Sequence, residues 1–478
     1  MLFNSPQFLF VFLPLVLGGY FLIAAKNRTA AAVAFLALAS LVFYAYWKPI
    51  YLVLILASVL GNFGISRWLT RTEPDRARRW ILILGVVFNL GLLGYFKYAA
   101  FVVTNAALAL GHSWSVGHIM LPLAISFFTF QQIAYLVDCW RGNTTPPTLA
   151  RYLLFVAFFP QLIAGPIVHH YELLPQFDAL ATRRPRLAPL VAGLTIFFAG
   201  LFKKVVLADS IGAHADTVFD AVAAGAAVGG FDAWIGAFAF GFQIYFDFSA
   251  YSDMAIGLAL MFGIRLPLNF NSPYKAASII DFWRRWHMTL SRFLREHLYV
   301  PLGGNRHGRA KQMRNILIVM VLGGLWHGAG WGFVLWGGLH GIYLVLNHAW
   351  RTFGIPVPLA VGRLATLIAV MFAWVPFRAE TWDRTATMWA AMLGGGEATA
   401  RLTNPMLAAA VMMGALAIVW ILPNTQDWTG FSRKEAVARL ASWRPTRTWA
   451  VVNAGIAMVG IAMILTRSET QEFLYFQF

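Results

Sequence analysis

The chain has 478 residues, of which 59% are hydrophobic and 12% are charged, and its mean hydropathy is +0.65. Soluble proteins carry about 25% charged residues, so this composition excludes an ordinary soluble domain. Long continuous apolar runs predict helices that cross a bilayer, and they exclude a membrane β-barrel, whose strands alternate polar and apolar residues over ~10 positions.

The net charge of +17 comes from 37 basic and 20 acidic residues. In a soluble protein this excess would indicate a nucleic-acid partner, but here the basic residues lie in short segments between apolar runs, as the positive-inside rule predicts. We therefore expect no nucleic acid. The single cysteine, Cys139, excludes an internal disulfide and a multi-cysteine zinc site.

Four apolar runs predict the first membrane spans. They cover residues 7–25, 30–47, 50–69 and 80–96, each close to the ~20 residues that a helix needs to cross a bilayer core. Five arginines fall within residues 67–79, and such a loop is expected on the cytoplasmic side. The N-terminus is then expected outside.

Polar residues and helix breakers mark the next part of the chain. Residues 119–139 predict a span that contains two glutamines and Asp138, which is too polar for a lipid-facing helix and should face the interior of the bundle. Residues 152–167 carry two prolines and a glycine. This pattern predicts a broken or re-entrant helix.

Further apolar runs complete the predicted bundle. Residues 188–208 predict a span whose Lys203 and Lys204 are expected to mark a membrane edge. Residues 231–262 predict a span that carries Asp247 and Asp253 at a high cost in free energy. Beyond the central segment, spans are expected near 357–377, 403–422 and 448–466. The prediction is a polytopic all-α membrane protein with roughly eleven transmembrane helices plus re-entrant or amphipathic helices.

Residues 281–341 form the expected catalytic core segment, where polar chemistry interrupts the apolar sequence. Residues 281–297 are expected to form one amphipathic or re-entrant helix with a stripe of arginines that includes Arg284 and Arg285. With Arg306 and neighbouring basic residues, this stripe could hold a phosphate-rich ligand. An equal alternative is a membrane-surface helix anchored by Trp and Arg. The absence of a P-loop or dinucleotide fingerprint argues against ATP chemistry.

His327 stands deep in an apolar run beside four glycines. One interpretation is a general base that deprotonates a hydroxyl, because the pKa of imidazole lies near working pH. The other is a buried histidine hydrogen-bonded between closely packed helices, and the residues alone do not separate the two. His340, also next to glycines, is expected to serve in helix packing or to support another residue of the site. No Cys or Glu accompanies these histidines at zinc spacing, so we expect no metal site. The sequence also has no Gly-x-Ser-x-Gly nucleophile elbow.

Several motifs, in this order along the chain, identify a family. Single pieces would be weak signals, but together they are specific. They are Gly94-Tyr95-Phe96-Lys97-Tyr98, Asn269-Phe270-Asn271-Ser272-Pro273-Tyr274, Phe282-Trp283-Arg284-Arg285-Trp286-His287, Leu302-Gly303-Gly304-Asn305-Arg306 and Gly323-Gly324-Leu325-Trp326-His327-Gly328. The chain resembles the membrane-bound O-acyltransferase family, and within it the bacterial proteins of alginate O-acetylation.

The resemblance implies a helical bundle around a central tunnel, where a cytosolic acyl-CoA meets an acceptor from the other side. It implies that His327 is the catalytic histidine and His287 a second, supporting residue, with Asn271 helping to position or polarise. Acetyl-CoA would be the acyl-donor substrate, and no resident cofactor is implied. The residues expected near the donor are Arg284, Arg285, Asn271 and Arg306.

The function expected from the resemblance is transfer of an acetyl group across the bacterial inner membrane for exopolysaccharide O-acetylation. The chain would form a single multi-pass domain over residues 1–478, in contact with membrane lipid, and would work with a periplasmic polysaccharide acetyltransferase partner. One alternative is the transfer of D-alanyl or another acyl group to a cell-wall polymer. A proton-coupled transporter or flippase would also need buried His and Asp, but it should show repeated halves, and the sequence has none.

Overall fold

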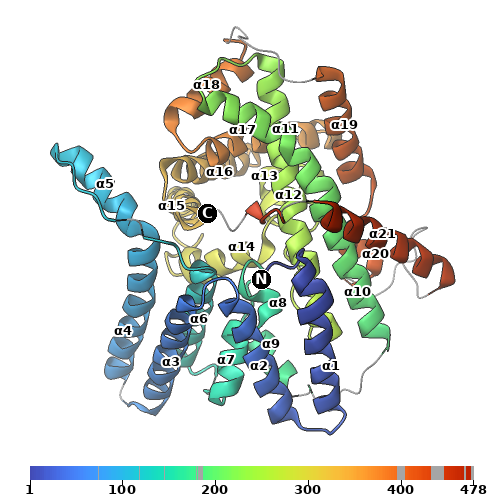
Figure 1. Cartoon of the computed structure of the whole chain (residues 1–478). Helices are drawn as coiled ribbons and strands as arrows, with labels where there is room; N and C mark the ends of the chain where they lie inside the picture. The colour runs from blue at the N-terminus through green and yellow to red at the C-terminus, as the bar shows by residue number, and fades with distance from the viewer. Residues whose placement is uncertain are drawn as a thin grey trace.

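The computed structural model describes residues 1–73, 75–117, 119–144, 146–178, 180, 187–395, 404–431, 446–467 and 470–474. Within these ranges the chain forms helices and connecting loops, with no strand. Figure 1 shows them as one assembly around the long central helix α12 (Gly230–Met261). The prediction of an all-α membrane protein is confirmed.

The helices follow the predicted apolar runs closely. The N-terminal group contains α1 (Leu13–Ala24), α2 (Thr29–Ala45), α3 (Ile50–Arg71), α4 (Asp75–Leu93), α5 (Ala99–Leu110), α6 (Ile125–Trp140), α7 (Leu149–Ala157), α8 (Phe159–Leu162) and α9 (His170–Phe177). The remaining helices besides α12 are α10 (Leu187–Phe202), α11 (Asp209–Ala223), α13 (Ile279–Trp283), α14 (Met288–Leu294), α15 (Arg309–His327), α16 (Trp331–Trp350), α17 (Leu359–Ala379), α18 (Trp382–Met392), α19 (Pro405–Ile421), α20 (Thr425–Thr429) and α21 (Arg447–Thr466). Short π-helical or 3-10 turns are η1 (Phe8–Phe12), η2 (Gly94–Tyr98), η3 (Lys203–Ala208), η4 (Pro273–Lys275) and η5 (Arg295–Tyr299).

Five helical segments of the described chain are long and apolar enough to cross a membrane, judged by length and composition. They are Ile50–Arg71, Asp75–Leu110, Leu187–Ala223, Leu359–Ala379 and Arg447–Thr466. Three shorter apolar helical segments are Phe8–Ala24, Thr29–Ala45 and Pro405–Ile421. Adding α12, α15 and α16, which are long but less apolar, gives the roughly eleven helices expected from the sequence.

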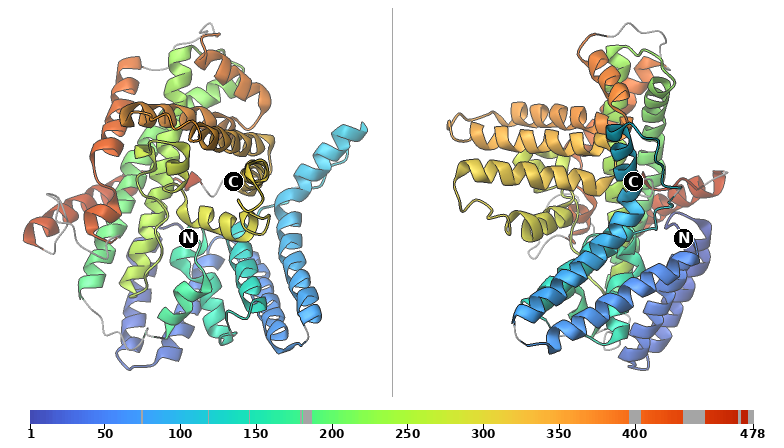
Figure 2. Two further views of the ribbon diagram at one scale, coloured as in Figure 1. Left: turned by 180° about the vertical axis from the view of Figure 1, so that it is seen from behind. Right: turned by 90° about the vertical axis from the view of Figure 1, so that its left-hand side faces the viewer.

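Helix α12 forms the centre of the core, in contact with α10, α11 and α17 (Figures 1 and 2). Glycines permit this close packing. A Cβ on Gly193 of α10 would lie 2.6 Å from the carbonyl oxygen of Gly257 on α12, and a Cβ on Gly257 would lie 2.6 Å from the carbonyl oxygen of Gly193. The two backbones therefore touch at this crossing.

Two of the three aspartates of α12, Asp247 and Asp253, are neutralised by lysines from η3. The Lys204 ammonium lies 2.6 Å from the Asp247 carboxylate and 2.8 Å from Asp209, and Lys203 lies 2.6 Å from Asp253. These lysines, which were expected to mark a membrane edge, lie in the middle of the helical segment 187–223, and Lys204 is buried. A buried ammonium is tolerated there because it has two carboxylate partners.

Two predicted irregular regions have different outcomes. The expected break near residue 160 is confirmed, since α7 ends at Ala157 and α8 begins at Phe159. The expectation of one continuous helix over 281–297 is wrong, because α13 ends at Trp283 and α14 begins at Met288. The backbone between α13 and α14 pairs instead with residues 269–271. Met288 N donates to Asn269 O at 2.9 Å, and Asn271 N donates to Arg285 O at 2.9 Å.

Candidate active site

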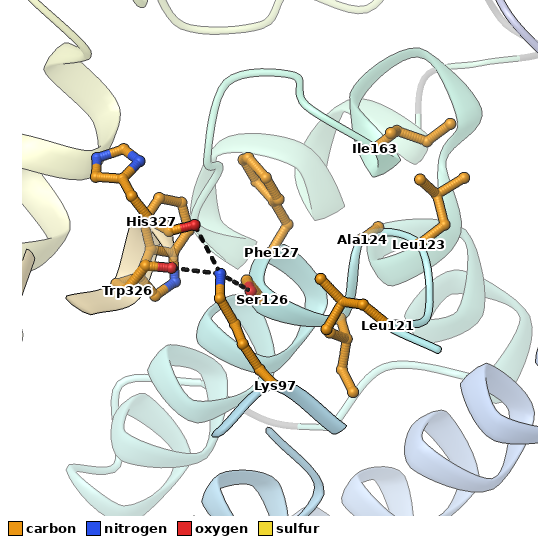
Figure 3. A pocket seen from close by; sticks show the side chains of 10 residues that line it. Lys97, Leu121, Leu123, Ala124, Ser126, Phe127, Ile163, Trp326 and His327 are labelled. Carbon is orange, nitrogen blue, oxygen red and sulfur yellow. Dashed lines mark hydrogen bonds between the residues drawn. The ribbon is translucent and has the colours of Figure 1, made fainter. Parts of the chain in front are cut away.

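His327 is the last residue of α15, buried at 5% exposure, where the helix ends in an extended Gly328. A helix end leaves carbonyl groups without intrahelical donors. Two residues of η2 supply them: the Lys97 ammonium donates to the carbonyls of Trp326 (2.6 Å) and His327 (3.0 Å), and the Tyr98 hydroxyl donates to Leu325 O at 2.9 Å. Figure 3 shows Lys97 reaching from below to this helix end. The backbone that carries His327 is therefore held from a segment 230 residues away.

The glycines near His327 let α15 and α16 pack backbone to backbone. A Cβ on Gly324 would lie 2.2 Å from Phe333 O, and a Cβ on Gly337 would lie 2.3 Å from Met320 O. Any larger residue would force the helices apart. This close crossing brings the His327 ring against Trp336 of α16, with ring centroids 5.1 Å apart and the rings nearly perpendicular.

His287 lies in the break between α13 and α14, with a left-handed backbone (φ 42°) and no exposure. Its Nδ1 lies 3.0 Å from Asn269 Oδ1, which also accepts a hydrogen bond from the Thr289 hydroxyl at 2.8 Å. Because Asn269 Oδ1 is an acceptor, Nδ1 of His287 carries the proton and Nε2 keeps its lone pair. The centroids of the His287 and His327 rings are 6.2 Å apart. The structure thus brings together the two histidines singled out in the sequence.

Two cavities lie along α15. The larger, of about 730 Å³, is lined among others by Trp283, Arg284, Arg292, Arg295, Gln312 and His348. The smaller, of about 30 Å³, is lined at the other end of α15 by Lys97, Ser126, Trp326 and His327 (Figure 3). The larger volume falls within the 300–1,000 Å³ typical of small-molecule sites, whereas the smaller one holds a water molecule or two. The first can admit a ligand of moderate size and the second reaches His327.

Sequence comparison identifies the family. The sequence model of the membrane-bound O-acyltransferase family matches residues 141–379. The chain is 45% identical over 425 residues to the peptidoglycan O-acetyltransferase of Helicobacter pylori, covering 82% of this chain and 80% of that protein. It is 43% identical over 431 residues to the probable alginate O-acetylase AlgI of Azotobacter vinelandii (88% and 84% covered), and 38% identical over 505 residues, the full length of both chains, to that of Pseudomonas putida.

This chain belongs to the membrane-bound O-acyltransferase family. It is a multi-pass membrane protein and an acyltransferase, as the motifs predicted. The matched residues 141–379 include His287, His327 and the residues that line the larger cavity. Lys97 lies outside that range, although it caps the helix that carries His327.

The four residues expected near the donor do not all lie together in this acyltransferase. Arg284 lines the larger cavity, whereas Arg285 pairs with Asp281 at 2.8 Å and also contacts Asn271 O at 3.4 Å. The Asn271 side chain accepts a hydrogen bond from Asn424 at 3.1 Å, and Arg306 is exposed in the loop before α15. The cavity instead gathers Arg284 with two other arginines of the predicted stripe, Arg292 and Arg295.

Two residues of the site were missed in the sequence. Lys97 was noted only as part of a motif, although a lysine inside an apolar run is itself a signal of a buried role. Asn269 carried no separate signal, because its role depends on a contact with His287 that the fold creates. Among the described residues, no group of three or more His, Cys, Asp or Glu side chains is arranged to hold a metal ion.

Proposed function

We propose that this acyltransferase moves an acetyl group from cytosolic acetyl-CoA across the bacterial inner membrane to a periplasmic acceptor for exopolysaccharide O-acetylation. The observation that carries the proposal is the arrangement of His287 and His327, buried 6.2 Å apart (ring centroids) at the end of α15, with a large basic cavity along the same helix. Such an arrangement suits a donor that enters from one side and an acceptor that arrives from the other.

The charge at the larger cavity suits the donor. Arg284, Arg292 and Arg295 line it, and guanidinium groups are well suited to the phosphates of a coenzyme A. In the right-hand view of Figure 2, the connection between α14 and α15 lies at the left edge of the molecule, on the same side as the connection between α3 and α4. The arginine-rich segment 67–79 therefore supports a cytosolic mouth for this cavity.

The chemistry follows from the two histidines. In our proposal His327 takes the proton from the acceptor hydroxyl, whose oxygen attacks the carbonyl carbon of the thioester. A C–O bond forms, the C–S bond breaks, and the proton on His327 passes to the departing thiolate. His287, whose Nδ1 proton is held by Asn269, lies beside His327 as a supporting residue and leaves the hydroxyl proton to His327. No resident cofactor is needed for these steps.

The acceptor is inferred from the relatives. Several are named probable alginate O-acetylases, which supports an exported polysaccharide, reached through a periplasmic acetyltransferase partner. The 45% identity to a peptidoglycan O-acetyltransferase favours a second candidate, the cell-wall glycan. The teichoic acid D-alanyltransferase of Streptococcus thermophilus is more distant, at 30% identity over 48% of this chain, so D-alanyl transfer is less well supported.

Deletion and complementation in the native bacterium test the proposal. O-acetyl groups should be measured in the same cells on the exported polysaccharide and on isolated peptidoglycan. We expect loss of ester from the exported polysaccharide on deletion and its return on complementation. Loss from peptidoglycan alone would instead establish the second candidate, and unchanged acetylation of both polymers would contradict the proposed function.

A further inference from the structure

Helix α16 carries two buried N–H groups that have no hydrogen-bond acceptor within the described residues. They are the indole Nε1 of Trp336, which is 1% exposed, and Nε2 of His340, which is 0% exposed. A buried donor without a partner is costly in free energy, so native proteins rarely keep one without a reason. Two such donors one helical turn apart therefore call for a ligand.

The hydrogen on His340 Nε2 follows from its other nitrogen. The Trp283 indole N–H donates to His340 Nδ1 at 3.3 Å. A nitrogen that accepts carries no proton in the neutral ring, so the proton of His340 is on Nε2. Trp283 thus fixes the tautomer in which His340 is a donor at the unpartnered position.

The two donors lie together and beside the base. Trp336 and His340 are four residues apart on α16, which places them on one face, and their ring centroids are 4.9 Å apart. The Trp336 ring also packs edge-on against His327, with centroids 5.1 Å apart.

The same face of α16 leads to the larger cavity. Leu344 and His348, four and eight residues after His340, line that cavity, and so does Trp283, the partner of His340. From Leu344 to Trp336 the helix rises by about 12 Å. A donor held in the cavity whose thioester arm follows α16 toward its N-terminus would approach the two N–H groups.

A neighbouring tryptophan shows that an unpartnered indole is not a general property of this aromatic cluster. Trp374 stacks on Trp336 with centroids 5.4 Å apart, yet its indole N–H donates to the Tyr274 hydroxyl at 3.1 Å. The Trp326 indole N–H also lacks a partner, but its ring packs against Phe127 and Phe130. The Trp326 ring also lies beside His327, with centroids 5.0 Å apart, so the pair on α16 is distinguished by having two unpartnered donors on one helix face.

We propose that the Trp336 indole N–H and the His340 Nε2–H form the oxyanion-binding pair of the acyl-transfer site. The inference rests on the proposed function and adds two catalytic residues to it. When the acceptor oxygen bonds to the thioester carbonyl carbon, the carbonyl π electrons move to its oxygen, and the two N–H groups donate to that oxyanion. The charge returns to the carbonyl as the C–S bond breaks. Fixed donors in a water-poor site stabilise such a charge strongly.

The test removes each N–H and keeps the ring. Trp336→Phe and His340→Phe are compared with Trp374→Phe, which removes a partnered indole N–H from the same cluster. Inverted membrane vesicles of a complemented deletion strain, with matched protein levels, are assayed for thiol release from acetyl-CoA. Affinity is measured with acetonyl-CoA, a ketone that keeps the carbonyl but releases no thiol.

We expect kcat to fall about 10²–10³-fold in Trp336→Phe and His340→Phe, as for other oxyanion donors, with nearly unchanged affinity for acetonyl-CoA. Trp374→Phe should change kcat by less than about threefold, and His340→Gln, which retains an N–H near the position of Nε2, should recover part of the rate. Equal kcat in Trp336→Phe, His340→Phe and Trp374→Phe would overturn the proposal. The proposal would also be overturned if Trp336→Phe and His340→Phe lost affinity for acetonyl-CoA by as large a factor as they lost rate.

A failure of the proposed function is recognised separately. If wild-type vesicles do not use acetyl-CoA but the cells still acylate a polymer through this protein, the donor assignment is wrong. The same variants are then compared by polymer acylation in cells. If Trp336 and His340 bind the oxyanion, Trp336→Phe and His340→Phe should again lose far more activity than Trp374→Phe. A protein that acylates no polymer in any assay would overturn both the proposed function and the pair.

Discussion

The Lys97 ammonium donates a hydrogen bond of 3.0 Å to the backbone carbonyl of His327 and one of 2.6 Å to that of Trp326. A third bond, of 3.2 Å, reaches the Ser126 hydroxyl. A positive charge at the C-terminal end of a helix is also favoured by the helix dipole. Lys97 therefore positions His327 through the end of α15.

Lys97→Met should lower kcat at least about tenfold, because two carbonyls at the end of α15 lose their donor and His327 loses its fixed position. Tyr98→Phe is the matched control: it removes the cap of Leu325 only and should reduce kcat less. Lys97→Arg should recover part of the rate, since it restores a cationic donor. Thiol release and thermal stability are measured on the same membranes. Equal losses in Lys97→Met and Tyr98→Phe would contradict a specific role for the ammonium.

Asn269→Leu should reduce kcat by about tenfold or more, because the proton of His287 would no longer be held on Nδ1. Asn269→Asp keeps an acceptor at this place and should retain more activity than Asn269→Leu. Thr289→Val removes the hydroxyl hydrogen bond to Asn269, keeps the one from the Thr289 backbone N–H, and serves as the control for local packing. We expect Thr289→Val to be the fastest of the three variants, Asn269→Asp to be slower and Asn269→Leu to be the slowest. If Asn269→Leu were faster than Asn269→Asp, the tautomer argument would be contradicted.

Arg284→Ala should raise KM for acetyl-CoA about tenfold, the effect of losing one charge-assisted hydrogen bond, with little change in kcat. Arg306→Ala should leave KM within about twofold, because that side chain is exposed and does not line the larger cavity. Added salt should weaken donor binding in the wild type. If the two variants have the same KM, the donor phosphates lie somewhere other than this cavity.

Gly337→Ala should lower the free energy of unfolding by about 1–3 kcal/mol and reduce activity, since its Cβ would lie 2.3 Å from Met320 O and push α15 away from α16. Gly338→Ala is a close control, because a Cβ there meets nothing within 4 Å. Thermal stability in detergent and thiol release report both effects. A stable, active Gly337→Ala protein would show that the α15–α16 crossing does not set the position of His327.

The membrane helices could be predicted closely, because hydropathy reports directly on transfer into lipid. The runs at 7–25, 231–262 and 448–466 became helical segments 8–24, 230–261 and 447–466. His327 could be singled out for the same reason: a polar ring in an apolar run has a large cost that needs an explanation.

The remaining features depend on contacts between distant parts of the chain. The break at His287 exists because Met288 pairs with Asn269, which a helical periodicity does not reveal. The pairing of Lys203 and Lys204 with aspartates of α12 could not be predicted, because these partners lie more than 40 residues away in the sequence. The separation of Arg284 from Arg306 depends on the folding of the loop before α15. Local sequence patterns do not report such pairings.

The central claim is that His327 is the base of an O-acetyl transfer, and one measurement tests it most directly. Cells that lack the native gene are complemented with the wild type or with His327→Ala at matched membrane levels, and the O-acetyl content of the exported polysaccharide is quantified. The account predicts full acetylation with the wild type and none above the deletion background with His327→Ala. Acetylation retained by a normally inserted His327→Ala protein would contradict the assignment.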